Sequence, residues 1–178
     1  RLAGDAPLPV YSFKSQVGHC LGAAGIIEAT AGLLAMQSGV IPATAGFGEP
    51  RPGCQLDYVA DGPRPASYDR FLSCNYAFGG NNAGVVVGLH DPDRPPPLEG
   101  RDGHRTMLSG GGAVTSLGLG TAALLEALRA GRRGIAPVGD RVRGETTSTL
   151  AGLVPEFEAR DVDRRASRVE ARDLVLAL

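Results

Sequence analysis

The segment that decides the fold reads YSFKSQVGHCLGAAGIIEATAGLLAMQS and covers residues 11–38. It begins with a turn of small residues between a lysine, Lys14, and a histidine, His19. From about residue 21 to residue 38 the sequence is rich in alanine and carries one charged side chain, that of Glu28. A helix that is apolar on all sides is typically buried inside a larger protein. The sequence therefore predicts a buried helix whose N-terminus follows the turn.

Three polar side chains of this segment, those of Lys14, His19 and Glu28, form a candidate site. A histidine at a helix N-terminus faces the positive end of the helix dipole, which disfavours the imidazolium. The neutral ring can donate one N–H to an oxygen that gains negative charge. Glu28 would be costly to bury unpaired, and Lys14 is the only lysine in the chain. The residues also fit a core histidine, a capping turn and a surface lysine, and their spacing leaves both interpretations open.

Composition excludes several classes of function. The chain has 178 residues, 43% of them hydrophobic, and a formal net charge of −1. This balance, with 5% aromatic residues, does not fit a nucleic-acid-binding surface. Glycine or polar residues interrupt the apolar runs, so we expect no membrane span. Three irregularly spaced cysteines, Cys20, Cys54 and Cys74, indicate neither a disulfide framework nor a metal site, and favour a cytoplasmic location.

The chain divides into two segments and a linker. Residues 1–90 are rich in glycine and apolar side chains, whereas residues 105–178 are rich in arginine and acidic residues. Between them, residues 91–104 combine prolines with charges and are not expected to form a helix or a central strand. Because the sequence opens on Arg1 rather than on methionine, we expect it to begin inside a longer protein.

Glycines and apolar periodicity place the other elements. Gly39 is expected to end the long helix, since glycine readily adopts the left-handed conformation found there. Two apolar stretches, 70–76 and 84–89, flank a glycine turn at 78–82 and predict a β-hairpin. Residues 40–69 contain five prolines and are predicted to be a loop. The second segment is expected to contain a strand at 106–109, a helix at 119–130 ended by Gly131, a loop with a short strand at 151–157 and a helix from about residue 167.

Motifs of the first segment resemble those of the β-ketoacyl-(acyl carrier protein) synthases. In order, they are YSFKSQVGHCLGAAGIIE at 11–28, IPAT at 41–44, CQLDYV at 54–59 and CNYAFGGNNA at 74–83. The resemblance implies an α/β fold of the layered thiolase-like type (αβαβα), present here only as partial domains. Residues 1–90 would be the C-terminal portion of one such domain. It further implies an acyltransferase that condenses an acyl thioester with malonyl-ACP by decarboxylative Claisen chemistry, in fatty-acid or polyketide-type biosynthesis.

The resemblance assigns a role to each residue of the candidate site. His19 matches the second histidine of the family's catalytic set, a donor to the thioester oxygen during malonyl decarboxylation. Lys14 matches the lysine that supports this set, and Glu28 matches its acidic partner. The family's nucleophilic cysteine and first histidine have no counterpart in this sequence. Cys20 is rejected as the nucleophile because adjacent helical residues point about 100° apart.

A second group of residues matches the family's gate beside the nucleophile. Phe78 corresponds to the gating aromatic residue, and Gly79 and Gly80 to its hinge. A packed hairpin aromatic is the plainer interpretation of Phe78. Ala77 stands where the family usually has glycine, and its methyl group is expected to stiffen the gate. Asn81 replaces the usual threonine.

The second segment resembles the N-terminal opening of another synthase. The matching stretches are MLSGGGAVTSLG at 107–118 and LLEALRAGRRGI at 124–135. Residues 105–178 are therefore interpreted as the truncated start of a second β-ketoacyl synthase-like domain. A phosphate-binding loop is the competing interpretation of Gly110–Gly112, but Thr115 occupies the third glycine position of that motif.

Cofactors and partners also follow from the resemblance. We expect no metal and no organic cofactor, because the phosphopantetheine arm of acyl carrier protein carries the substrates. The expected partners are acyl carrier protein, its acyl and malonyl thioesters, and a second subunit in a homodimer or a synthase/chain-length-factor heterodimer. Two alternatives stay open: a non-catalytic, chain-length-factor-like subunit, and an inactive fragment. The chain alone is expected to be inactive, since the nucleophile and the first histidine are missing.

Overall fold

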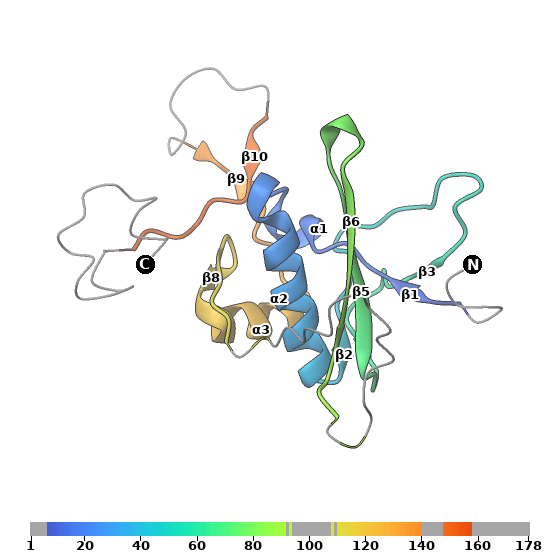
Figure 1. Cartoon of the computed structure of the whole chain (residues 1–178). Coiled ribbons are helices and arrows are strands. Elements are labelled where there is room, and N and C mark those ends of the chain that lie inside the picture. Colours follow the sequence, from blue (N-terminus) through green and yellow to red (C-terminus); the bar gives the residue numbers. More distant parts are fainter. Residues whose placement is uncertain (1–6, 92, 94–107, 109, 140–147, 158–178) are drawn as a thin grey trace.

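The computed structural model describes residues 7–91, 93, 108, 110–139 and 148–157. These residues combine helices with short two-stranded sheets (Figure 1). The long helix α2 (Ala24–Gln37) lies at the centre, with the hairpin of β5 and β6 on one side and helix α3 on the other (Figure 1). None of the described helices is long and apolar enough to cross a membrane.

The turn between Lys14 and His19 is a single helical turn, α1 (Lys14–Val17). It follows strand β1 (Pro9–Val10), which pairs in parallel with β3 (Asp57–Tyr58). The turn ends at Gly18, whose φ of 86° lies in the left-handed region that glycine adopts without strain. A short 3₁₀ helix, Leu21–Ala23, then leads into α2.

The predicted helix at 21–38 is confirmed as an α-helix from Ala24 to Gln37, whereas its first three residues form the 3₁₀ helix. Gly39, with φ of 65°, follows its end. Its burial is confirmed on one side only, because Ile26 on another side is 63% exposed. On the buried side, a Cβ added at Gly32 would lie 2.5 Å from the ring of Phe71 in β5. Glycine at this position therefore allows the helix to pack closely against the sheet, which offsets its poor helix propensity.

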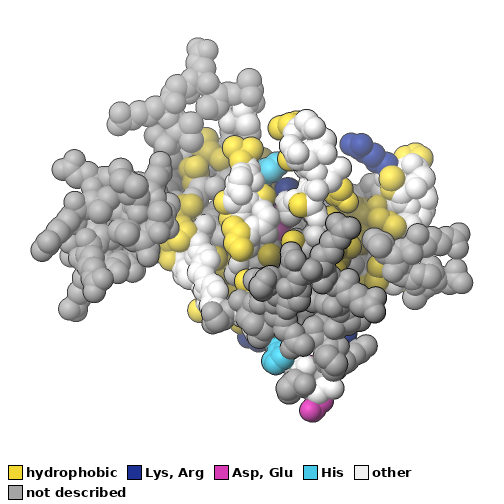
Figure 2. All heavy atoms as spheres, in the orientation of Figure 1, with side chains coloured by type: hydrophobic (Ala, Val, Ile, Leu, Met, Phe, Trp, Pro, Cys, Tyr) yellow, Lys and Arg dark blue, Asp and Glu magenta, His cyan; other side chains and the backbone are white. Residues whose placement is uncertain are grey.

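The predicted hairpin is also confirmed. Strands β5 (Arg70–Tyr76) and β6 (Asn82–Gly88) pair antiparallel from Arg70↔Gly88 to Tyr76↔Asn82. One face of the pair contacts α2. The other face carries partly or largely exposed apolar side chains, among them Leu72, Tyr76 and Val86. Apolar side chains reach the surface around the central helix and the hairpin (Figure 2).

The prediction of a loop at residues 40–69 is wrong in part. Strand β2 (Val40–Ile41) pairs antiparallel with β4 (Arg64–Pro65), and β3 also lies in this stretch. Each of these strands is only two residues long, so few ladder hydrogen bonds are needed and proline is tolerated. The guanidinium of Arg64 donates to both carboxylate oxygens of Asp57, at 2.7 and 2.9 Å, and ties β4 to β3.

In the second segment the predicted helix is confirmed as α3 (Gly120–Arg129), and Gly131, with φ of 62°, follows its end. The short strand expected within 151–157 is β10 (Leu150–Ala151), which begins one residue before that range. The predicted strand at 106–109, apart from Leu108, and the helix from residue 167 lie outside the described residues, as does most of the linker. The segment's strands are β7 (Val114–Thr115) with β8 (Gly118–Leu119), and β9 (Ala136–Pro137) with β10 (Leu150–Ala151).

The two segments share one hydrophobic core. The first segment contributes buried residues of α1, the preceding loop and α2, and the second contributes residues that precede β7 or lie in α3. The core residues are Phe13, Val17, Ala31, Ala113, Leu124 and Leu128. The described part of the second segment is thus packed against the candidate site. Its assignment as the start of another synthase domain stays a prediction.

Candidate active site

Hydroxyl groups anchor the turn that carries Lys14. The Ser15 hydroxyl donates to the carbonyl of Ser12 at 2.7 Å and accepts the Ala45 N–H at 2.8 Å. The Ser12 N–H donates to the Thr44 hydroxyl at 2.9 Å. These bonds fix the turn against the end of the IPAT motif. Ser12 and Ser15 were not among the predicted site residues, although serine commonly makes such local bonds in turns.

Lys14 and Glu28 form the ion pair that the sequence analysis anticipated. The ammonium of Lys14 donates to Oε1 of Glu28. The Glu28 side chain is only 16% exposed, so the ammonium of Lys14 offsets the desolvation of the Glu28 carboxylate. Tyr11, which the sequence analysis did not select, lies in the same environment: burial first, then Tyr68 and Glu28, raise its pKa.

The imidazole of His19 has a defined hydrogen bond although the residue is exposed. Its Nδ1 accepts the backbone N–H of Leu21 at 3.0 Å. A nitrogen that accepts a hydrogen bond carries no proton, so the neutral ring has its proton on Nε2. Leu21 has φ of 47°, an uncommon conformation for a residue other than glycine. The local backbone thus presents His19 as an Nε2–H donor, the form that the decarboxylation role requires.

Cys20 is a poor nucleophile in this environment. Its thiol is partly buried and lies 3.9 Å from the carbonyl of Gly18. Burial and the negative charge of Glu28 raise the pKa of the Cys20 thiol, and the positive charge of Lys14 opposes them only in part. Because the thiolate is the reactive form, this shift agrees with the rejection of Cys20 as the family's nucleophile. The helical geometry first given as the reason is wrong, since His19 and Cys20 precede the 3₁₀ helix.

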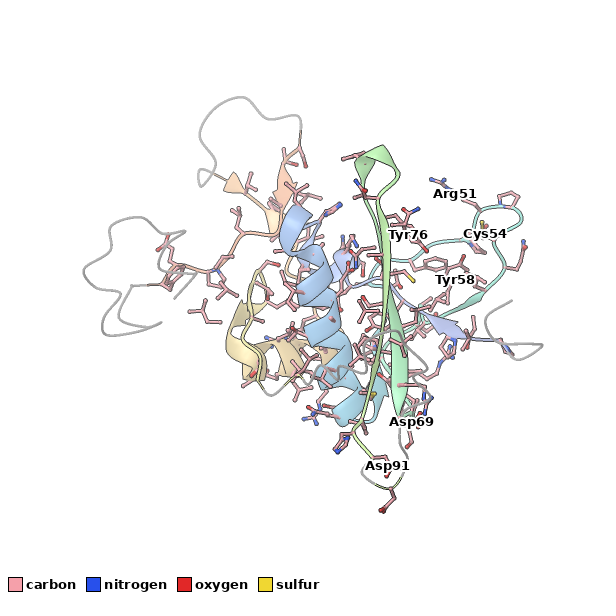
Figure 3. All side chains as sticks on the ribbon, viewed as in Figure 1. Arg51, Cys54, Tyr58, Asp69, Tyr76 and Asp91 are labelled. Carbon is pink, nitrogen blue, oxygen red and sulfur yellow. The ribbon has the colours of Figure 1, made fainter. Side chains whose placement is uncertain are left out.

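Replacing Glu28 by glutamine is expected to make Cys20 react several-fold faster with iodoacetamide at pH 8. The carboxylate raises the pKa of the thiol and Lys14 lowers it, so removing the carboxylate lowers that pKa and increases the thiolate fraction. Peptide mass spectrometry measures the rate. Cys54 serves as an internal control because it is exposed in the outer loop, away from α1 (Figure 3). An unchanged or slower reaction of Cys20 would show that Glu28 does not act on this thiol.

The candidate gate lies at the tip of the hairpin. Phe78 is 99% exposed, and Gly79 and Gly80 have φ of 81° and 82°. Both glycines therefore occupy the left-handed region, where other residues are strained. The tip projects toward the end of α2 that bears its N-terminus (Figure 1). Within the described ranges no ring contact or hydrogen bond joins Phe78 to the Lys14–His19 turn, and its role as a gate stays a prediction.

Among the described residues, no group of three or more histidine, cysteine or acidic side chains is placed to hold a metal ion. The expectation that the protein needs no cofactor stays a prediction.

Comparison with known proteins finds a family similar to part of the first segment. Residues 1–48 match the family described as "Beta-ketoacyl synthase, C-terminal domain". These residues are similar to the C-terminal part of β-ketoacyl synthases. The Lys14–His19 turn and Glu28 lie inside the matched range, so the geometry above belongs to the part of the chain that resembles these synthases.

Individual relatives extend the similarity. The chain is 46% identical over 80 residues to the tetracenomycin polyketide synthase ketoacyl synthase alpha subunit of Streptomyces glaucescens, which covers 45% of this chain and 19% of the relative. It is 41% identical over 87 residues to the oxytetracycline polyketide putative beta-ketoacyl synthase 1 of Streptomyces rimosus, covering 49% and 20%. It is 38% identical over 89 residues to the 3-oxoacyl-[acyl-carrier-protein] synthase 2 of Mycobacterium tuberculosis, covering 50% and 21%. The aligned part spans about a fifth of each of these synthases.

Proposed function

We propose that the complete protein is a β-ketoacyl-ACP synthase, an acyltransferase that joins an acyl thioester to malonyl-ACP with loss of carbon dioxide. The observation that carries the proposal is the hydrogen bond from the Leu21 N–H to Nδ1 of His19. It leaves the neutral His19 ring with an Nε2–H donor, and Lys14 and Glu28 of the same segment form an ion pair. The names of the synthase relatives support the same activity.

In the proposed reaction, the bond between the malonyl carboxylate and its α-carbon breaks and carbon dioxide leaves. The electron pair passes into an enolate whose negative charge develops on the thioester oxygen. Nε2–H of His19 donates to this oxygen, and an aimed neutral donor lowers the barrier without needing to lose its proton. The positive charge of Lys14 and the negative charge of Glu28 compensate each other in their ion pair. The enolate carbon then attacks the carbonyl carbon of the acyl group carried on the enzyme's nucleophilic cysteine. The new carbon–carbon bond forms, the bond between that carbonyl carbon and sulfur breaks, and the cysteine leaves as a thiolate; this chain has no residue that matches this cysteine.

The proposal extends to the architecture of the complete protein. It includes a layered thiolase-like fold, the Phe78 gate with its Gly79 and Gly80 hinge, and a second synthase-like domain that begins near residue 105. It also includes acyl carrier protein as substrate donor, a homodimer or synthase/chain-length-factor pair, no resident cofactor and a cytoplasmic location. The names of the Streptomyces relatives support polyketide-type synthesis, and that of the mycobacterial relative supports acyl-carrier-protein-dependent synthesis more generally.

A non-catalytic, chain-length-factor-like subunit is the alternative from a different class. The quoted relatives are named as synthases, which supports the catalytic subunit instead. The presence of both His19 and its ion-paired neighbours Lys14 and Glu28 favours the same choice, because a subunit that only shapes the product has no need of an enolate donor.

We expect the 178-residue chain alone to show no malonyl decarboxylation, because no residue matches the nucleophile or the first histidine. A chimera tests the proposed activity directly: the aligned residues of this chain replace their counterparts in the tetracenomycin ketoacyl synthase alpha subunit. We expect it to release carbon dioxide from malonyl-ACP, with the parent subunit as control. Turnover by the chain alone would contradict the role assignments, and a folded chimera without turnover would contradict the proposed function.

A further inference from the structure

Gln16 connects the candidate site to the second segment of the chain. It lies in α1 between Lys14 and His19, and its side chain is completely buried. Nε2 of Gln16 donates to the backbone carbonyl of Arg132 at 2.9 Å. Its backbone carbonyl accepts the N–H of Gly134 at 2.7 Å. One residue of the turn therefore makes two hydrogen bonds, through different groups, to one loop after α3.

The buried amide of Gln16 is only half satisfied. Its Oε1 is buried and has no hydrogen-bond partner among the residues that the structure describes. An unpaired acceptor in a core lowers stability, and an apolar side chain of similar size would avoid this loss. The contribution of glutamine at this position is therefore not simple core packing. What it provides is the directed bond from Nε2 to the loop.

Further contacts place this loop and the β7–β8 turn near the Lys14–His19 turn. The guanidinium of Arg133 lies beside Gly46, where an added Cβ would be 3.1 Å from its nitrogen. Gly46 follows Ala45, whose N–H donates to the Ser15 hydroxyl in the turn. The Ser116 hydroxyl reaches the carbonyl of Val17 at 3.5 Å. The second segment thus makes polar as well as apolar contacts with the turn.

We propose that Gln16 is a positioning residue through which the Arg132–Gly134 loop sets the conformation of the Lys14–His19 turn. In this arrangement the second segment is a structural part of the first segment's site, whatever larger domain it belongs to. The coupling itself follows from the contacts of Gln16. It rests on the proposed function only for the chemistry that the positioned His19 performs.

Hydrogen exchange of the full chain with Gln16→Met tests this coupling. Methionine keeps the volume but removes both the donor and the unpaired acceptor, so overall stability is expected to change little. Loss of the Nε2 bond should speed exchange about fivefold at the N–H of Gly134 and of Leu21. Gly134 is informative because its acceptor, a backbone carbonyl, remains. The ¹⁵N shifts of the His19 ring should show a smaller excess of the Nε2–H tautomer.

Arg132→Ala is the matched control. It removes the exposed ion pair of Arg132 with Glu126 but keeps the carbonyl that accepts from Gln16, so exchange at Leu21 should match the unmodified chain. Wild-type exchange at Gly134 and Leu21 in Gln16→Met would overturn the proposal. If Gln16→Met unfolds, Gln16→Asn replaces it, because its shorter side chain cannot reach the carbonyl of Arg132. Faster hydrogen exchange confined to the amides of Gly134 and Leu21 supports the coupling. Uniformly faster exchange along α2 overturns it. No readout uses turnover, so an inactive chimera would leave this result unaffected.

Discussion

Replacing His19 by alanine in the chimera is expected to lower the rate of malonyl decarboxylation about 10²- to 10³-fold, the loss typical of removing one oxyanion donor. The imidazole is held by the N–H of Leu21, so its Nε2–H is oriented before the charge on the substrate oxygen develops. Such a donor stabilises the enolate more than the ground-state thioester, and the loss should fall on kcat. Release of carbon dioxide from labelled malonyl-ACP measures the rate.

Stability should not explain this loss, because His19 is exposed and its truncation leaves no cavity in the core. His90 is the matched control, because it is also exposed. A chimera with His90→Ala should retain the decarboxylation rate of the unmodified chimera. His19→Gln, which keeps an N–H donor of similar reach, should recover part of the activity. A His19→Ala chimera that decarboxylates as fast as the unmodified chimera would rule out the donor role.

The elements best predicted from sequence are those fixed by local chemistry. The long alanine-rich run forms a helix, and the glycines between two apolar strands form a hairpin turn, because both depend on neighbouring residues alone. The pairing of Lys14 with Glu28 was also accessible, since a buried carboxylate needs a cation and the chain contains a single lysine. Local rules and one charge argument were enough for these features.

The features that sequence missed depend on contacts between distant residues. The bond from Gln16 to Arg132 joins positions 116 residues apart, and no pattern near Gln16 indicates it. The bridge from Ala45 to Ser15 is of the same kind. The division into two segments followed composition and the proline-rich linker, whereas the shared core depends on which apolar faces meet in three dimensions. Apolar periodicity indicates that a face is buried but does not identify the partner that covers it.

Leu128→Ala is expected to lower the free energy of unfolding by about 2–5 kcal/mol, the range for removing a fully buried leucine side chain. Leu128 is 0% exposed on α3, in the same cluster as Ala31 of α2. Because the core is shared, the loss should reach the first segment as well as α3. Urea denaturation followed by circular dichroism measures the free energy, and hydrogen exchange of the α2 amides shows which elements are affected.

The contrast with an exposed leucine shows why this prediction tests the whole arrangement. Leu150 is 51% exposed, so Leu150→Ala should change the free energy of unfolding by no more than about 0.5 kcal/mol. If the second segment were an independent unit, Leu128→Ala would weaken α3 and leave exchange in α2 unchanged. Faster exchange in both helices would mean that they unfold together. The Lys14–His19 turn would then depend for its stability on residues that lie more than ninety positions further along the chain.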